Sequence, residues 1–270
     1  MAKNQLEFIK LGGSLITDKD QDSTARYEML DQLSHEIAIA IKQHPEKKFV
    51  IGHGSGSFGH FAAKKYNTRN GFTSDPNPSS YWDGFHRVYQ KAHQLHNIVL
   101  STLIKAGVPA LSLPPIDQVI TKNHNIISWP MEVITACLHA KMVPVVFGDV
   151  VFDCEIGGTI LSTEELFAHL ARQLHPDRIL IAGIEEGVWL DFANKTTLVE
   201  NIDQGNLEQV INAVDGSTST DVTGGMRTKV MEMVELAKFQ PGLSINIFDG
   251  SKKGNLAKVI SGEIIGTNIN

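Results

Sequence analysis

Short runs of apolar residues alternate along the chain with longer stretches in which apolar residues recur every three or four positions. The short runs are typical of buried strands, and the longer stretches are typical of amphipathic helices. The predicted strands are Leu6–Leu11, Phe49–Gly52, Val108–Leu111, Met142–Phe147, Arg178–Ala182 and Ser244–Phe248. The predicted helices are Tyr27–Gln43, Tyr81–Ala106, Met131–Ala140, Thr163–Leu174 and Gly225–Phe239.

The regular order of strand and helix predicts an α/β protein, a three-layer αβα sandwich around a mainly parallel open sheet. The alternation of strands and helices is interrupted at Val150–Ile160. There, two short β-type runs flank the polar segment CEIGG and predict a hairpin. We therefore divide the chain into an N-terminal lobe, residues 1–150, and a C-terminal lobe, residues 151–270. Asn67–Ser80 is rich in turn-forming residues and predicts a surface loop, either a lid or a connector.

Composition narrows the class of protein. The chain has 270 residues, 42% of them hydrophobic, and 30 acidic residues against 24 basic ones, which disfavours nucleic acid or an anionic membrane as a partner. The charged N-terminus and the lack of a long apolar segment predict a cytoplasmic protein without a membrane span. Cys137 and Cys154 show no metal-binding spacing, and we expect both to be core thiols in a reducing compartment.

Three glycine-containing turns follow predicted strands: KLGGS at Lys10–Ser14, GHGSGSFGH at Gly52–His60, and Gly148–Asp149. Turns at the carboxyl ends of parallel strands line the ligand crevice of an open sheet, so all three are expected to face one site. The four glycines of GHGSGSFGH leave backbone N–H groups free to converge on an anion such as a phosphate. The alternative is a turn that only allows tight packing of strand against helix.

Two lysine-containing motifs extend this prediction. Lys10 ends a buried-type strand beside the first turn, where it would lie over a phosphate or, alternatively, extend to water. DVTGGMRTKV, Asp221–Val230, precedes a predicted helix and supplies either phosphate-binding groups or an ordinary cap with surface cations. The Walker pattern and the dinucleotide-binding fingerprint are both missing in proper form, which argues against P-loop and Rossmann enzymes.

In combination, KLGGS, GHGSGSFGH, VPVVFGDVVFD with GGTILS, and DVTGGMRTKV resemble the amino acid kinase superfamily. The resemblance spans nearly the whole chain and is greatest to the isopentenyl phosphate kinase family. It implies the superfamily fold and transfer of the ATP γ-phosphoryl group to isopentenyl phosphate, giving isopentenyl diphosphate in the alternative mevalonate route. ATP as co-substrate, Mg²⁺ and a homodimer are implied with it.

The resemblance also implies a set of site residues. Lys10 would stabilise charge on the transferred phosphoryl group, and Lys19 and Lys229 would reach the ATP phosphates. Further contacts to the nucleotide would come from Gly12, Gly13, Ser14, Gly183, Gly224 and Gly225. The acceptor phosphate would be held by Gly54, Ser55, Gly59, Gly158 and, as a hydrogen-bond donor, His60.

Two segments depart from the family pattern. STEE, Ser162–Glu165, replaces the usual SGDD, so the carboxylate that organises the catalytic lysines would come from Glu164. GIEEGVW, Gly183–Trp189, replaces the usual TDVDGVY on the nucleotide side. ATP remains the expected donor.

The residues themselves are consistent with a phosphate acceptor. A phosphate monoester is already largely dianionic near neutrality, so its transfer needs no base and depends on positioning and on cancellation of charge. Lys10, Lys19, Lys229 and His60 can supply that charge. Mg²⁺ is expected to join the β- and γ-phosphates, and its protein ligands are unknown.

Two groups of side chains have an ordinary and a functional interpretation. His93 and His96 are three residues apart on a predicted helix, and we expect a polar helix face rather than a metal site. We expect core packing for five apolar side chains, with lining of an apolar acceptor tail as the alternative: Phe72, Tyr81, Trp82, Phe85 and Val88.

Two other functions stay open. One is a kinase of the same fold acting on another small phosphate or phosphonate such as fosfomycin, and the other is a non-catalytic nucleotide sensor.

Overall fold

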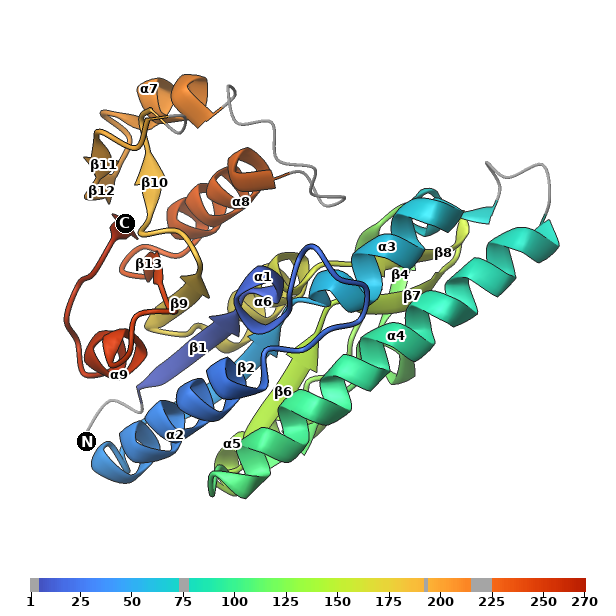
Figure 1. Ribbon diagram of the computed structural model, residues 1–270, viewed down its shortest axis with the longest axis horizontal. Coiled ribbons are helices and arrows are strands. Elements are labelled where there is room, and N and C mark those ends of the chain that lie inside the picture. Colours follow the sequence, from blue (N-terminus) through green and yellow to red (C-terminus); the bar gives the residue numbers. More distant parts are fainter. Residues whose placement is uncertain (1–4, 73–77, 192–193, 215–224) are drawn as a thin grey trace.

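The computed structural model describes residues 5–72, 78–191, 194–214 and 225–270. Its centre is an eight-stranded sheet (Figure 1). The strand order is β12 (Asn201–Ile202), β14 (Thr267–Ile269), β13 (Ser244–Asp249), β9 (Arg178–Gly183), β1 (Leu6–Leu11), β2 (Lys48–His53), β6 (Val143–Phe147) and β3 (Ala110–Ser112). Neighbouring strands are parallel except for the antiparallel pair β13 and β14.

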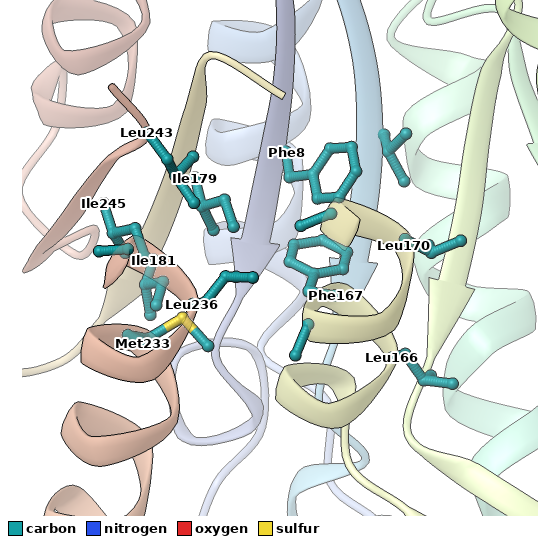
Figure 2. Close-up of a cluster of buried hydrophobic side chains, with 14 of the residues drawn as sticks. Phe8, Leu166, Phe167, Leu170, Ile179, Ile181, Met233, Leu236, Leu243 and Ile245 are labelled. Carbon is teal, nitrogen blue, oxygen red and sulfur yellow. The ribbon is translucent and has the colours of Figure 1, made fainter. Parts of the chain in front are cut away.

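Alternation of side chains along the central strands builds two separate cores. Ile9 and Leu11 of β1 pack on one face with the helices α2 (Tyr27–Gln43), α4 (Pro78–Lys105) and α9 (Asn255–Ile260). Phe8 points to the other face, where its ring centroid lies 5.0 Å from that of Phe167 in α6 (Thr163–Leu174). Figure 2 shows this second core, which also holds Met233 of α8 (Gly225–Phe239). The predicted three-layer αβα sandwich is confirmed.

A smaller sheet stands beside the first one. Its strand order is β5 (Asn125–Ser128), β4 (Ile120–Lys122), β7 (Asp149–Asp153) and β8 (Gly157–Leu161). The pair β7 and β8 is the predicted hairpin, and the Asp153 carboxylate holds its turn by accepting hydrogen bonds from the N–H groups of Glu155 and Ile156. Because the proposed boundary at residue 150 falls inside β7, the first strand of this hairpin is shared between the two predicted lobes.

Short elements complete the chain. They are α1 (Gly13–Ile16), α3 (Gly56–Tyr66), η1 (Thr68–Asn70), η3 (Pro115–Asp117), α5 (Glu132–His139), β10 (Val188–Trp189), β11 (Leu198–Val199) and α7 (Leu207–Val214). α1 and α3 begin at the carboxyl ends of β1 and β2. They therefore start where an α/β sheet binds its ligands.

Two sequence predictions need correction. The segment after α3 is not only a surface loop, because Thr68 is fully buried and Gly71 packs against Ile156 in the β7–β8 turn. Cys137 is buried as expected, whereas Cys154 is exposed at the polar end of the hairpin. No helix among the described residues is long and apolar enough to cross a membrane.

Candidate active site

The three predicted glycine turns meet at the carboxyl edge of the large sheet. The Gly12 N–H donates to the Ala182 carbonyl at 2.8 Å, the Gly54 N–H donates to the Leu11 carbonyl at 3.1 Å, and the Gly148 N–H donates to the His53 carbonyl at 3.1 Å. Glycine is required where the turns touch, since a Cβ on Gly13 would lie 2.6 Å from the Gly56 nitrogen. The expectation that these turns share one place in the fold is therefore confirmed.

The second turn has the geometry of an anion-binding loop. Ser55 is in the right-handed helical region and is followed by Gly56 at φ +49°, an alternation that directs successive N–H groups into one concavity. A side chain at Gly56 would meet the Thr17 hydroxyl at 2.1 Å, so this position accepts only glycine. The Thr17 Oγ1 in turn accepts a hydrogen bond from the Ser57 N–H at 3.0 Å, which fixes α3 against α1.

Lys10 is buried at the end of β1, only 5% exposed, and forms an ion pair with Glu164. Glu164 is equally buried and lies in the first turn of α6, far along the chain from its partner. The interpretation of Lys10 as a strand-end lysine that extends to water is therefore wrong. The longer side chain of Glu164, compared with the Asp of the family pattern, still reaches Lys10.

The start of α6 is held by a capping box. The Glu165 N–H donates to the Ser162 hydroxyl at 3.1 Å, and the Glu165 carboxylate accepts from the Ser162 N–H at 2.7 Å. Arg69 of η1 forms a two-point ion pair with the same carboxylate, with nitrogen to oxygen distances of 2.8 and 3.1 Å. This arrangement orders the helical turn that carries Glu164.

A further carboxyl group stands near these acids. Burial raises the pKa of Glu232 in α8 to about 7, and the negative charges of Glu165 and Glu164 raise it as well. Arg69 and Lys10 act in the opposite direction. The region around Lys10 is therefore a cluster of acidic and basic groups in which the charge on Glu232 varies near neutral pH.

An aromatic cluster lies between α3, α4 and the small sheet. Tyr81, Phe85 and Val88 are buried in it, and a Cβ on Gly158 would lie 2.8 Å from the Phe85 ring. Trp82 is partly exposed at 37% and packs at a tilt against the exposed Phe152, with 6.3 Å between ring centroids. Core packing is thus confirmed for Tyr81, Phe85 and Val88, and Gly158 contacts rings rather than a polar turn.

The other predicted residues are distributed around the meeting turns. His60 is half-buried in α3, and Ser55 lies against the backbone of Gly59. Lys19 is exposed in the segment between α1 and α2. Gly183 ends β9 beside the Gly250 N–H, which donates to its carbonyl at 2.8 Å.

Part of the expected nucleotide site falls outside what the structure describes. Gly224 lies outside the described residues. Gly225 begins α8 and Lys229 lies in its first turns, but the side chain of Lys229 is also outside the described part. Their assignment to the ATP phosphates stays a prediction.

The two histidines of α4 do not form the polar helix face that the sequence predicts. His96 is 2% exposed and bonds to His53 and Ser112, while His93 bonds to the buried Asp149 at 3.0 Å. Within the described ranges, no three His, Cys, Asp or Glu side chains are grouped to hold a metal ion. Sequence reasoning did not single out His53, although it lies inside the GHGSGSFGH motif.

Glycine turns at the carboxyl edge of the sheet, with a buried lysine beside them, are the features expected of a phosphotransferase of the α/β class. The family model described as "Amino acid kinase family" matches residues 5–245. The chain belongs to the amino acid kinase family.

Comparison with individual relatives shows which members of this family the chain resembles. The chain is 34% identical to the isopentenyl phosphate kinase of Methanocaldococcus jannaschii, covering 98% of both chains. It is 30% identical to the enzyme of the same name from Methanothermobacter thermautotrophicus, covering 97% of this chain and 98% of the relative. A solved isopentenyl phosphate kinase superposes with a TM-score of 0.84 and 27% identity, covering 98% of this chain and 100% of that chain. The resemblance stated from the motifs is therefore confirmed.

Proposed function

We propose that this protein transfers the γ-phosphoryl group of ATP to isopentenyl phosphate, giving isopentenyl diphosphate and ADP. The observation that carries the proposal is the 34% identity to the Methanocaldococcus jannaschii enzyme over 98% of both chains. An oxygen of the acceptor phosphate bonds to the γ-phosphorus, and the bond from that phosphorus to the β–γ bridging oxygen breaks. ADP leaves with the bridging oxygen and its electron pair.

The N-terminal lobe holds the acceptor in this proposal. Gly54, Ser55 and Gly59 contribute backbone groups to the acceptor phosphate, and His60 donates a hydrogen bond to it. The aromatic cluster around Phe85 supports an apolar tail on the acceptor, because the exposed rings of Trp82 and Phe152 at its edge suit a prenyl chain. Gly158 would then shape the apolar part of the acceptor site.

The C-terminal lobe holds the nucleotide. Lys229, Gly224 and Gly225 at the start of α8 contact the phosphates of ATP in this proposal, together with Gly183 and the turn Gly12–Ser14. Lys10 stabilises charge on the phosphoryl group during transfer, Glu164 holds Lys10 in place, and Lys19 moves onto the ATP phosphates when they bind. Retention of the buried Lys10–Glu164 pair argues against a non-catalytic sensor.

We propose Mg²⁺ as part of the ATP complex. No metal-binding group of three His, Cys, Asp or Glu side chains exists in the described part of the chain, so the protein side chains found there do not build a dedicated site. Phosphate oxygens and water are the ligands that Mg²⁺ commonly keeps in such complexes. When bound, the ion neutralises part of the phosphate charge.

We also propose a cytoplasmic homodimer. Two observations support it. Cys137 and Cys154 are both free thiols, and strand β3, which ends the large sheet and packs against α4, leaves Leu111 exposed, as α4 leaves Ile104. An open sheet edge with apolar side chains favours association of two copies. Sedimentation of the wild-type protein and of a Leu111→Lys variant tests this, and monomeric wild type would contradict it.

A coupled assay for ADP release tests the reaction. The panel contains isopentenyl phosphate, alkyl phosphates of other lengths, fosfomycin, isopentenol and free amino acids. We expect the highest kcat/KM with isopentenyl phosphate. A higher kcat/KM with fosfomycin would establish the phosphonate kinase instead, and no turnover with any acceptor, despite ATP binding, would establish the sensor.

A further inference from the structure

A chain of buried hydrogen bonds ends on the second glycine turn. The His53 Nδ1 lies 3.1 Å from the Gly54 carbonyl oxygen, and its Nε2 lies 3.1 Å from the His96 Nδ1. The His96 Nε2 lies 2.7 Å from the Ser112 hydroxyl. His53 is fully buried and His96 is 2% exposed, so water does not compete along this chain.

The Gly54 carbonyl oxygen at one end of this hydrogen-bond chain determines which nitrogen of each histidine carries a proton. A carbonyl oxygen only accepts, so the His53 Nδ1 must carry its proton and donate to Gly54. A neutral imidazole has one N–H, and the His53 Nε2 therefore accepts from the His96 Nδ1. The His96 Nε2 then accepts from the Ser112 hydroxyl, which gives one direction of donation from β3 to the turn.

Both rings are held neutral. Burial lowers the pKa of His53 to about 4, against a smaller rise from the Gly54 contact. Burial lowers the pKa of His96 even further, and the neighbouring His53 and His93 add to this effect. The other groups facing the rings are Phe147, which stacks on both, and the His93–Asp149 pair on the α4 side.

The orientation of the Gly54–Ser55 peptide depends on this chain of hydrogen bonds. In a trans peptide the C=O of one residue and the N–H of the next point in opposite directions. A Gly54 carbonyl turned inward to His53 therefore turns the Ser55 N–H outward, toward the concavity formed by Ser55 and Gly56. Within the described residues the Ser55 N–H has no protein acceptor.

We propose that His53 is a positioning residue, held in one tautomer by His96 and Ser112, that orients the Gly54–Ser55 peptide for binding of the acceptor phosphate. The proposal rests on the proposed function for the identity of the acceptor. His53 touches neither substrate, and it acts through the peptide. Glycine at position 54 has no Cβ to restrain that peptide, so the hydrogen bond from His53 supplies the restraint.

Two near-isosteric substitutions separate this role from simple packing. Asn places an N–H where the histidine Nδ1 stands, so His53→Asn keeps the bond to Gly54. Gln places its amide near the Nε2 position, so His53→Gln keeps the contact to His96 and loses the bond to Gly54. We expect His53→Gln to raise the KM for isopentenyl phosphate about 10- to 100-fold, with the ATP KM unchanged, and His53→Asn to restore most of the loss.

Controls separate stability from positioning. His169→Gln replaces a half-buried histidine that stacks on Trp129 and should lower the melting temperature without changing either KM. If His53→Gln does not fold, Ser112→Ala takes its place, since it releases the tautomer of His96 and should raise the KM for isopentenyl phosphate by a smaller factor. An unchanged KM in the folded variant, or equal losses in His53→Asn and His53→Gln, would overturn the proposal.

A measurement without turnover distinguishes this proposal from the proposed function. Nitrogen NMR of the wild type should show His53 and His96 as neutral Nδ1–H tautomers, and the Ser55 amide signal should move on titration with inorganic phosphate. His53→Gln should abolish that movement. If the tautomers and the phosphate response are as expected but isopentenyl phosphate is not turned over, the positioning role of His53 is supported and the proposed function is refuted. If isopentenyl phosphate is turned over but His53 is an Nε2–H tautomer, the proposed function is supported and the positioning role is refuted.

Discussion

At the scale of single residues, the buried ion pair of Lys10 and Glu164 is predicted to have two separable roles, one in catalysis and one in stability. Removing the Lys10 charge by Lys10→Met should lower kcat about 100- to 1,000-fold, because an electrostatic donor to the transition state is lost. It should also destabilise the fold, since Glu164 is left buried without its partner. Kinetics and urea unfolding measure the two effects separately.

Lys47→Met is the matched control for Lys10→Met. The Lys47 side chain is 8% exposed and pairs with Glu7 at 2.8 Å, but at the opposite end of β1, where Arg178 also lies 3.5 Å from the Glu7 carboxylate. Lys47→Met should lose stability and keep kcat. The double variant Lys10→Met with Glu164→Gln should regain stability without regaining activity, and recovery of kcat in that variant would contradict the role of Lys10.

His60 is predicted to act on one substrate only. His60→Ala should lower kcat/KM for isopentenyl phosphate about 10- to 150-fold, as expected for a hydrogen bond to a charged group, with nearly unchanged affinity for ATP. Calorimetric titration with each substrate checks this. His86→Ala, an exposed histidine of α4, should change neither affinity, and a mainly ATP-side loss in His60→Ala would reject the assignment.

At the scale of elements, the N-terminal turn of α6 holds Glu164 and Glu165 at the carboxyl edge of the sheet. Ser162→Ala removes the side-chain half of the capping box and should lower the free energy of unfolding by about 1 kcal/mol. Ser101→Ala is the control, because Ser101 is exposed on α4 and its hydroxyl donates to the Asn97 carbonyl within the same helix. Equal losses in the two variants, measured by urea unfolding, would show that the cap does not stabilise α6.

The helix and strand boundaries show which elements local sequence determines. Helices at Tyr27–Gln43 and Thr163–Leu174 and the strand at Leu6–Leu11 occur at the residues predicted from periodicity alone. Strands β4 and β5 were not predicted, because each is short and largely exposed and lacks an apolar run. Their position depends on pairing with β7 and on Asp153, which accepts N–H groups from Asn123 and His124.

At the scale of the whole molecule, the buried histidines predict how stability depends on pH. The folded-state pKa of His53 is lowered to about 4 from 6.5, so the unfolded chain binds more protons between these values. Stability is therefore full above about pH 6.5 and falls as the pH drops toward 4, by at most about 3 kcal/mol from His53. Asp149, whose pKa burial raises, acts in the opposite direction.

Urea unfolding at a series of pH values between about 7 and 4 tests this dependence. His53→Asn, which removes one of the titrating groups, should show a shallower loss of stability than the wild type. The low pKa of Asp153 affects stability only below its ordinary unfolded value, in a more acidic range. An equal slope in wild type and His53→Asn would contradict the neutral state of His53 in the folded protein.

The sequence by itself determined the layered α/β class, the glycine turns at the strand ends and the family, because these follow from local periodicity and from motifs that glycine makes specific. Only the tertiary structure decided which polar groups meet. Lys10 contacts Glu164, which lies 154 positions away in the sequence, and His53 contacts His96, which lies 43 positions away. Such pairs are set by the strand order together with the packing of α4 and α6 on the sheet, which brings residues distant in sequence to the carboxyl ends of β1 and β2 and buries them there.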